Sequence, residues 1–198
     1  MGTSNLNLAG LIGSRICHDL ISPIGAIHNG LELIGLSQGD HRDELGLISQ
    51  SADNAGARIR FFRLAFGPGS DEALPRAEIE AVLRDLQQGH RLRLHWQVAG
   101  PAPRNLVRLA FLGIMCAETA MPYGGDIAVT ADGGTWSVGG TAPRLNIAED
   151  LWRPLLRGEP PADVTPAHVQ FALIALVAGD LGRALAVELA EDRLRLRF

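Results

Sequence analysis

Residues 45–66, LGLISQSADNAGARIRFFRLAF, decide the first part of the fold. Apolar side chains recur in this stretch at alternating steps of three and four, the spacing of a helix that packs along one side of a bundle. Asp43 and Glu44 precede the stretch and arginines lie near its end, as the helix dipole favours. One long helix with an apolar seam is predicted. The seam consists of Leu45, Ile48, Ala52, Ala55, Ile59, Phe62 and Phe66.

A second seam with the same spacing runs upstream from Leu20 to Ile34, and a polar turn at residues 36–41 separates the two. The two stretches therefore predict a helical hairpin. A single hairpin cannot bury both seams, whereas two copies together form a four-helix bundle. We expect a homodimer; the alternative is that the hairpin packs on the rest of its own chain. Residues 67–70, GPGS, end the hairpin, which sets domains at 1–68 and 72–198.

The pattern changes after about residue 74, where short alternating stretches mix with apolar helical ones. The second domain is predicted to be a mixed sheet covered by helices, an α/β sandwich, so that the whole chain belongs to the α+β class. The expected helices are 75 to Gly89, 105–121, 151–156 and 166–182, and the expected strands are 92–98, 126–130, 135–138, 185–189 and 194–198.

Composition excludes several classes of function. The chain has 198 residues, a net charge of -4 and no lysine, so a P-loop lysine and Schiff-base chemistry are excluded and nucleic acid is not expected as a partner. No apolar run approaches the roughly 18 residues of a membrane span, and no secretion signal is recognised. We expect a cytoplasmic protein without a membrane partner. Cys17 and Cys116 lie in apolar helical surroundings and are expected to be buried free thiols, with no disulfide or metal site.

Residues 15–23, RICHDLISP, carry the chemistry. At roughly 100° per residue, His18 lies about 200° from Ile16 and Leu20, which point toward the core. His18 is therefore expected to point outward, onto a polar face of small side chains with room for another protein. That face includes Arg15, Ser22, Gly25 and Asn29.

The residues around His18 favour a functional site over a packing position. Proline inside a helix costs on the order of 3 kcal/mol, so Pro23 indicates function, although a neutral bend is the alternative. Imidazole titrates near neutrality, and its neutral nitrogen can attack phosphorus. Asp19 is expected to hydrogen-bond the imidazole. Arg15 is expected to offset phosphoryl charge or, equally, to be a solvated surface arginine.

With these residues in view, the hairpin resembles the dimerisation and phosphotransfer hairpin of histidine kinases, which carry a histidine, an adjacent acid and a proline five positions on. His18, Asp19 and Pro23 match, while Ser22 stands where kinases usually have Asn or Thr. A closer resemblance is to the ChpT-like histidine phosphotransferase family of alphaproteobacteria. The matching stretches are CHDLISP at 17–23, NGLEL at 29–33 and RFFRLAFG at 60–67.

The resemblance implies a dimeric phosphotransferase whose second domain is a degenerate histidine-kinase ATPase domain. It also implies a phosphorelay: the receiver domain of a hybrid kinase phosphorylates His18, which then passes the group to a downstream response regulator. The chain itself would bind no cofactor or metal, and Mg²⁺ would be carried by the receiver. Receivers are expected to dock on the His18 face, with Ile21, Ser22, Gly25 and Asn29 in contact.

ATP binding is not expected, because the ATPase motifs are missing from the sequence. The helix at 112–120 has Glu118 as its only possible metal ligand, where such domains use an asparagine. The Asp132-Gly133-Gly134 turn has the wrong spacing for an adenine site, and residues 148–165 are proline-rich rather than a glycine-rich lid. An active histidine kinase and a non-catalytic dimeric adaptor remain the alternatives.

Overall fold

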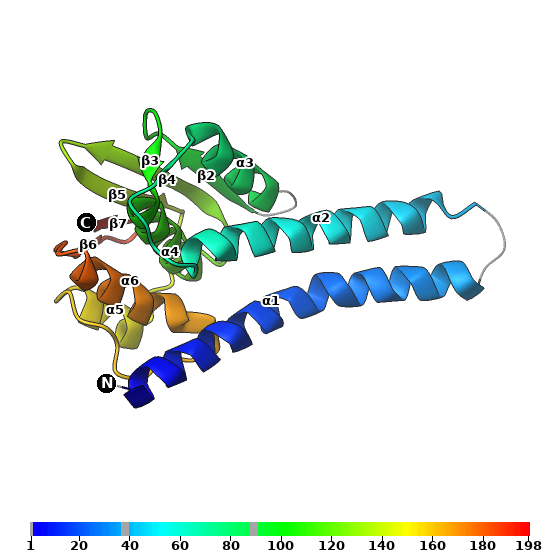
Figure 1. Cartoon of the computed structure of the whole chain (residues 1–198), viewed down its shortest axis with the longest axis horizontal. Helices are drawn as coiled ribbons and strands as arrows, with labels where there is room; N and C mark the ends of the chain where they lie inside the picture. Colours follow the sequence, from blue (N-terminus) through cyan, green and yellow to red (C-terminus); the bar gives the residue numbers. More distant parts are fainter. Residues whose placement is uncertain (1, 37–39, 88–90) are drawn as a thin grey trace.

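The structure is a computed structural model that describes residues 2–36, 40–87 and 91–198. A long helical hairpin projects from an α/β domain (Figure 1). Part of the predicted turn, residues 37–39, and Gly89, the predicted end of the third helix, lie outside the described residues. The helices are α1 Gly2–Leu36, α2 Arg42–Ala65, α3 Arg76–Gln87, α4 Arg104–Ala120, α5 Glu149–Leu155 and α6 Val169–Asp180, the last preceded by the short 3₁₀ helix η1 Pro166–His168.

Helices α1 and α2 pack side by side in opposite directions and form the predicted hairpin (Figure 1). Helix α1 continues through Pro23, whose ring is buried. Gly30 allows the two helices to approach closely, because a Cβ atom there would lie 2.6 Å from Cγ1 of Ile48 on α2. This close approach contributes to the packing of α1 against α2.

The base of the hairpin packs on the second domain of its own chain. At this end, the seams are buried in the way that was predicted as the alternative to a homodimer. Phe61 and Phe62 near the end of α2 are buried, and the Phe61 ring stacks on Phe111 of α4 with centroids 4.7 Å apart. On α1, Leu11 and Ile16 pack against the same core. The two domains therefore share one hydrophobic core at this end.

The distal half of the hairpin keeps its apolar seam exposed. Ile24 and Leu45 are exposed, and Leu31 shows 55% of its surface to solvent. The contacts within one chain therefore leave part of the predicted seam uncovered, and large exposed apolar groups in contiguous patches mark interaction surfaces.

The second domain is a mixed five-stranded sheet with helices α3, α4 and α6 on one face, as predicted (Figure 1). The strands run in the order β2-β4-β5-β7-β6; β2 and β4 are parallel and the other neighbours are antiparallel. Gly133 and Gly134 have positive φ of 53° and 85°, which fits the tight turn between β4 and β5. The strands are β2 Leu92–Trp96, β4 Gly125–Asp132, β5 Thr135–Thr141, β6 Ala186–Leu189 and β7 Arg193–Arg197, and β1 Ala73–Leu74 pairs separately with β3 Ala102–Pro103.

One expectation about the cysteines is confirmed and the other is wrong. Cys116 on α4 is fully buried, and that burial raises the pKa of its thiol well above the ordinary value. Cys17 is exposed, because it lies beside His18 on the outer face of α1 and not on the face that packs against the core. Both thiols are free.

Candidate functional site

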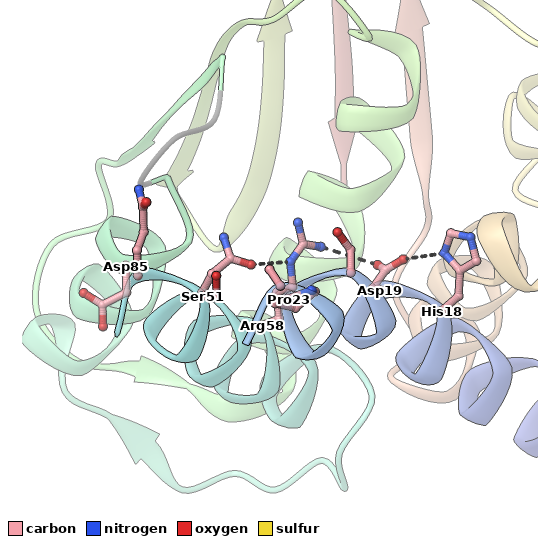
Figure 2. Close-up of a pocket in the computed structure, with 10 residues that line it drawn as sticks. His18, Asp19, Pro23, Ser51, Arg58 and Asp85 are labelled. Atoms are coloured by element: carbon pink, nitrogen blue, oxygen red, sulfur yellow. Dashed lines mark hydrogen bonds and ion pairs between the residues drawn. The ribbon is translucent and has the colours of Figure 1, made fainter. Parts of the chain in front are cut away.

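His18 lies on α1 where the helix leaves the second domain and points outward, as the helical periodicity predicts (Figure 2). Its side chain is 82% exposed. Packing therefore contributes little to the orientation of the ring. The Nδ1 atom of the ring lies 3.1 Å from Oδ1 of Asp19. The other ring nitrogen, Nε2, is the one available to a reaction partner.

Asp19 is largely enclosed, with 11% of its side chain exposed. Its Oδ1 atom contacts His18, and its Oδ2 atom accepts a hydrogen bond of 2.8 Å from Nε of Arg15. Nη1 of Arg58 on α2 lies 3.8 Å from the same Oδ2 atom. The carboxylate therefore links the histidine to two guanidinium groups, one from each helix of the hairpin.

Arg15 is not the solvated surface arginine considered as an alternative. It is partly buried, and besides Asp19 it donates a hydrogen bond to the main-chain carbonyl of Ala167 in η1. Arg15 thus connects the His18 segment to the second domain. The next residue of η1, His168, has a lowered pKa. Burial of its imidazole is the larger cause, and the nearby positive charge of Arg15 is the smaller one.

A groove of about 460 Å³ extends from His18 between the two helices of the hairpin toward α3 (Figure 2). Most of the residues that line it are polar, and Nε of Arg58 donates a hydrogen bond of 3.0 Å to Oδ1 of Asn54. The α2 residues and Asp85 were not predicted from the sequence. The groove is lined by His18, Asp19, Ser22, Pro23, Ala26, Gln50, Ser51, Asn54, Arg58 and Asp85.

The predicted docking residues follow His18 along the exposed face of α1. Ile21 is 68% exposed, and Ser22 and Asn29 are exposed as well. A Cβ atom at Gly25 would meet nothing within 4 Å, so the helix offers open space there. Of the four residues, Ser22 alone lines the groove. The face is open to a protein, and the docking role itself stays a prediction.

Two features of the second domain bear on nucleotide or metal binding. Asp132, Gly133 and Gly134 form the turn between β4 and β5, as predicted. Glu118 lies on α4 near Leu86 and Leu92 at a small apolar hollow. Among residues 2–36, 40–87 and 91–198, no three His, Cys, Asp or Glu side chains gather as metal ligands would. Within the same ranges, no helix combines the length and apolar character of a membrane span.

Comparison with known proteins places the chain in a family. Residues 76–193 match the histidine phosphotransferase C-terminal domain family. The whole chain is 33% identical to the protein phosphotransferase ChpT of Brucella abortus (strain 2308), over 96% of this chain and 94% of that protein. The chain therefore belongs to the ChpT-like histidine phosphotransferase family, and its enzymatic class is that of a phosphotransferase, in agreement with the sequence resemblance.

Solved structures agree with this assignment. A bacterial phosphotransferase superposes with a TM-score of 0.82 and 30% identity, covering 97% of this chain and 95% of the other. The histidine kinase ThkA, solved in complex with the response regulator protein TrrA, superposes with a TM-score of 0.52 and 12% identity over 99% of this chain and 62% of the kinase chain. The second likeness shows a shared fold: a helical hairpin followed by an α/β domain.

Proposed function

We propose that the chain is a phosphoryl carrier that moves a phosphoryl group through His18 between the aspartates of response-regulator receiver domains. The single observation that carries the proposal is the pairing of an exposed imidazole with an enclosed carboxylate, Nδ1 of His18 lying 3.1 Å from Oδ1 of Asp19. A carboxylate can only accept a hydrogen bond, so the nitrogen facing it carries hydrogen. The lone pair is then on Nε2, which faces solvent and an arriving partner.

The transfer step follows from this geometry. The Nε2 lone pair attacks the phosphorus of a receiver's aspartyl phosphate; an N–P bond forms, and the P–O bond breaks with its electron pair left on the receiver's carboxylate. The hydrogen on Nδ1 stays between His18 and Asp19 throughout. The reverse step, onto a second receiver, runs by the same route. Such transfer depends on positioning and charge stabilisation, and the receiver's own Mg²⁺ supplies much of the latter.

Docking of the receiver is assigned to the exposed face of α1 beyond the histidine. Ile21 offers an apolar anchor, and Gly25 leaves room for close approach. Ser22 and Asn29 add polar groups on the same face.

The hairpin is proposed to be the dimer interface, forming a four-helix bundle with a second copy. The support is the exposed apolar seam: most of the exposed large apolar side chains of the described residues lie on the hairpin and not on the second domain. Leu31→Glu is expected to give a monomer in sedimentation analysis, since Leu31 is exposed in the single chain and its change leaves the monomer folded. Leu176→Glu, an exposed position on α6, is the matched control and should leave the mass unchanged.

The chain is proposed to receive phosphate without ATP, with its second domain a degenerate ATPase-like scaffold of the phosphotransfer site. The support is the sequence of that domain, which offers Glu118 where an ATPase would offer an asparagine. The scaffold role agrees with the shared core at the base of the hairpin and with the hydrogen bond from Arg15 to η1.

The test is to incubate the purified protein with a labelled phosphorylated receiver and Mg²⁺, and separately with labelled ATP. Label is expected to move from the receiver to the wild-type protein and not to His18→Ala, with none incorporated from ATP. Incorporation directly from ATP would make the chain a kinase. Failure of transfer from every one of several receivers would favour the dimeric adaptor.

A further inference from the structure

The exposed His18 ring depends on Asp19 for its orientation, and Asp19 depends in turn on the groups at its other oxygen. The imidazole has 82% of its surface in solvent, so packing does not select its tautomer. An imidazole in water populates both neutral tautomers, and the hydrogen bond to Oδ1 of Asp19 favours the one with hydrogen on Nδ1. Whatever fixes the direction of the carboxylate therefore fixes the reactive nitrogen.

Two arginines hold the Oδ2 atom of Asp19, and they differ in what else they bind. Arg15 is on the same helix and shares its donors with the carbonyl of Ala167. Arg58 comes from α2 and reaches across the hairpin, its Nη1 atom 3.8 Å from Oδ2. Arg58 is itself oriented by Asn54, one helical turn earlier, whose Oδ1 atom accepts a hydrogen bond of 3.0 Å from Nε of Arg58.

We propose that Arg58 is a positioning residue for phosphoryl transfer, with Asn54 as its support. By attracting Oδ2 of Asp19, Arg58 keeps Oδ1 on Nδ1 of His18 and so keeps the lone pair on Nε2. This role rests on the proposed function, because it explains the reactivity of the same histidine. A purely structural arginine would join α1 to α2 and affect stability, but it would leave the His18 tautomer as it is.

The experiment reads the tautomer by ¹⁵N NMR of the histidine rings in the full chain at about pH 8, where imidazole is neutral. It needs no receiver. Signals of His18 are assigned by their absence from His18→Gln. The wild type is expected to show hydrogen on Nδ1. Arg58→Ala is expected to shift the population toward hydrogen on Nε2 and to slow transfer from a phosphorylated receiver by about two- to fivefold, the scale of one partly exposed charged contact.

Matched variants separate positioning from stability. Arg58→Lys keeps the positive charge and should recover most of the Nδ1–H population. Asn54→Ala, which removes the support and keeps the guanidinium, should shift the tautomer in the same direction by less. Arg63→Ala removes an exposed arginine of α2 that lines a different hollow and should change neither the tautomer nor the rate.

An unchanged His18 tautomer in folded Arg58→Ala would overturn the proposal, whatever happens to the transfer rate. If Arg58→Ala fails to fold, Asn54→Ala decides, and an unchanged tautomer there overturns the proposal in the same way. If the tautomer shifts while the wild-type protein accepts no phosphate from receivers, Arg58 still sets the His18 tautomer, and the proposed function is what fails.

Discussion

Replacing Asp19 by asparagine changes one atom and is expected to reverse the hydrogen bond on which the chemistry depends. The amide can face Arg15 and Arg58 with either its oxygen or its NH₂ group. Turning the NH₂ group toward Arg15, whose Nε lies 2.8 Å from that position, would lose a charge-assisted hydrogen bond worth about 1.5–3 kcal/mol. The oxygen should therefore face the arginines in more than about 90% of molecules, since about 1.4 kcal/mol is tenfold.

The NH₂ group of the asparagine then faces Nδ1 of His18 and donates to it. That arrangement places the ring hydrogen on Nε2, the nitrogen that has to attack phosphorus. The reactive tautomer is then left in less than about 10% of molecules, so we expect Asp19→Asn to slow transfer by about tenfold or more. The fold should be retained, because the two side chains have nearly the same shape.

The assay is a single-turnover measurement of label moving from a phosphorylated receiver to the protein, with His18→Gln as the inactive reference. Circular dichroism of Asp19→Asn should overlay that of the wild type. A transfer rate within about threefold of wild type, well short of the expected tenfold loss, would refute the role given to the Asp19 hydrogen bond.

Four further outcomes are expected. Ile21→Asp should slow transfer at subsaturating receiver concentration and leave the free energy of unfolding unchanged; equal rates would remove Ile21 from the docking face. Phe61→Ala, at a buried ring stacked on α4, should lower the free energy of unfolding in urea by about 3–5 kcal/mol; a loss below about 1 kcal/mol would mean that the base of the hairpin is not packed on the second domain. A thiol reagent should modify Cys17 in the native protein and reach Cys116 only after unfolding; two reactive thiols in the native protein would contradict the burial of α4. The pKa of His168 is lowered in the folded protein, so as pH falls through the ordinary histidine range near about 6.5 the unfolded chain binds a proton before the folded one does. The free energy of unfolding should therefore decline over that range, and His168→Gln should reduce the decline. An unchanged pH dependence of the free energy of unfolding, measured by urea titration, would argue against this role of His168.

The main elements of the fold could be predicted because they depend on periodicities that are local in sequence. Steps of three and four identify α2, and the alternation from Leu92 identifies β2. The early start of α1 at Gly2 was harder to predict, since glycines at 2, 10 and 13 weaken the local helical preference. Packing of Leu11 and Ile16 on the second domain overrides that preference.

The candidate site was predictable only where it lies on one helix. His18, Asp19 and Pro23 lie within two successive turns of α1, so their spacing in the sequence gives their relation in space. Arg58 and its partner Asn54 come from α2. The register between α1 and α2 decides which turn of α2 faces Asp19. Close contacts between the helices, such as that of Gly30 with Ile48, contribute to this register. That register is a property of packing between distant segments, and the sequence pattern contains no direct signal of it.

The error about Cys17 has a similar origin. An apolar neighbourhood in sequence predicts burial, yet Ile16 turns toward the second domain while Cys17 turns with His18 toward solvent. In the proposed dimer, a second chain would bury the exposed apolar seam of the distal hairpin.

The central claim is that His18 carries the phosphoryl group on its Nε2 atom. The most direct measurement is ³¹P and ¹H NMR of the protein after phosphorylation by a receiver, combined with mass-spectrometric mapping of the modified residue. The account predicts a single phosphoramidate on Nε2 of His18 that is discharged by adding an unphosphorylated receiver. Phosphate on another residue, or label that persists in His18→Ala, would contradict it.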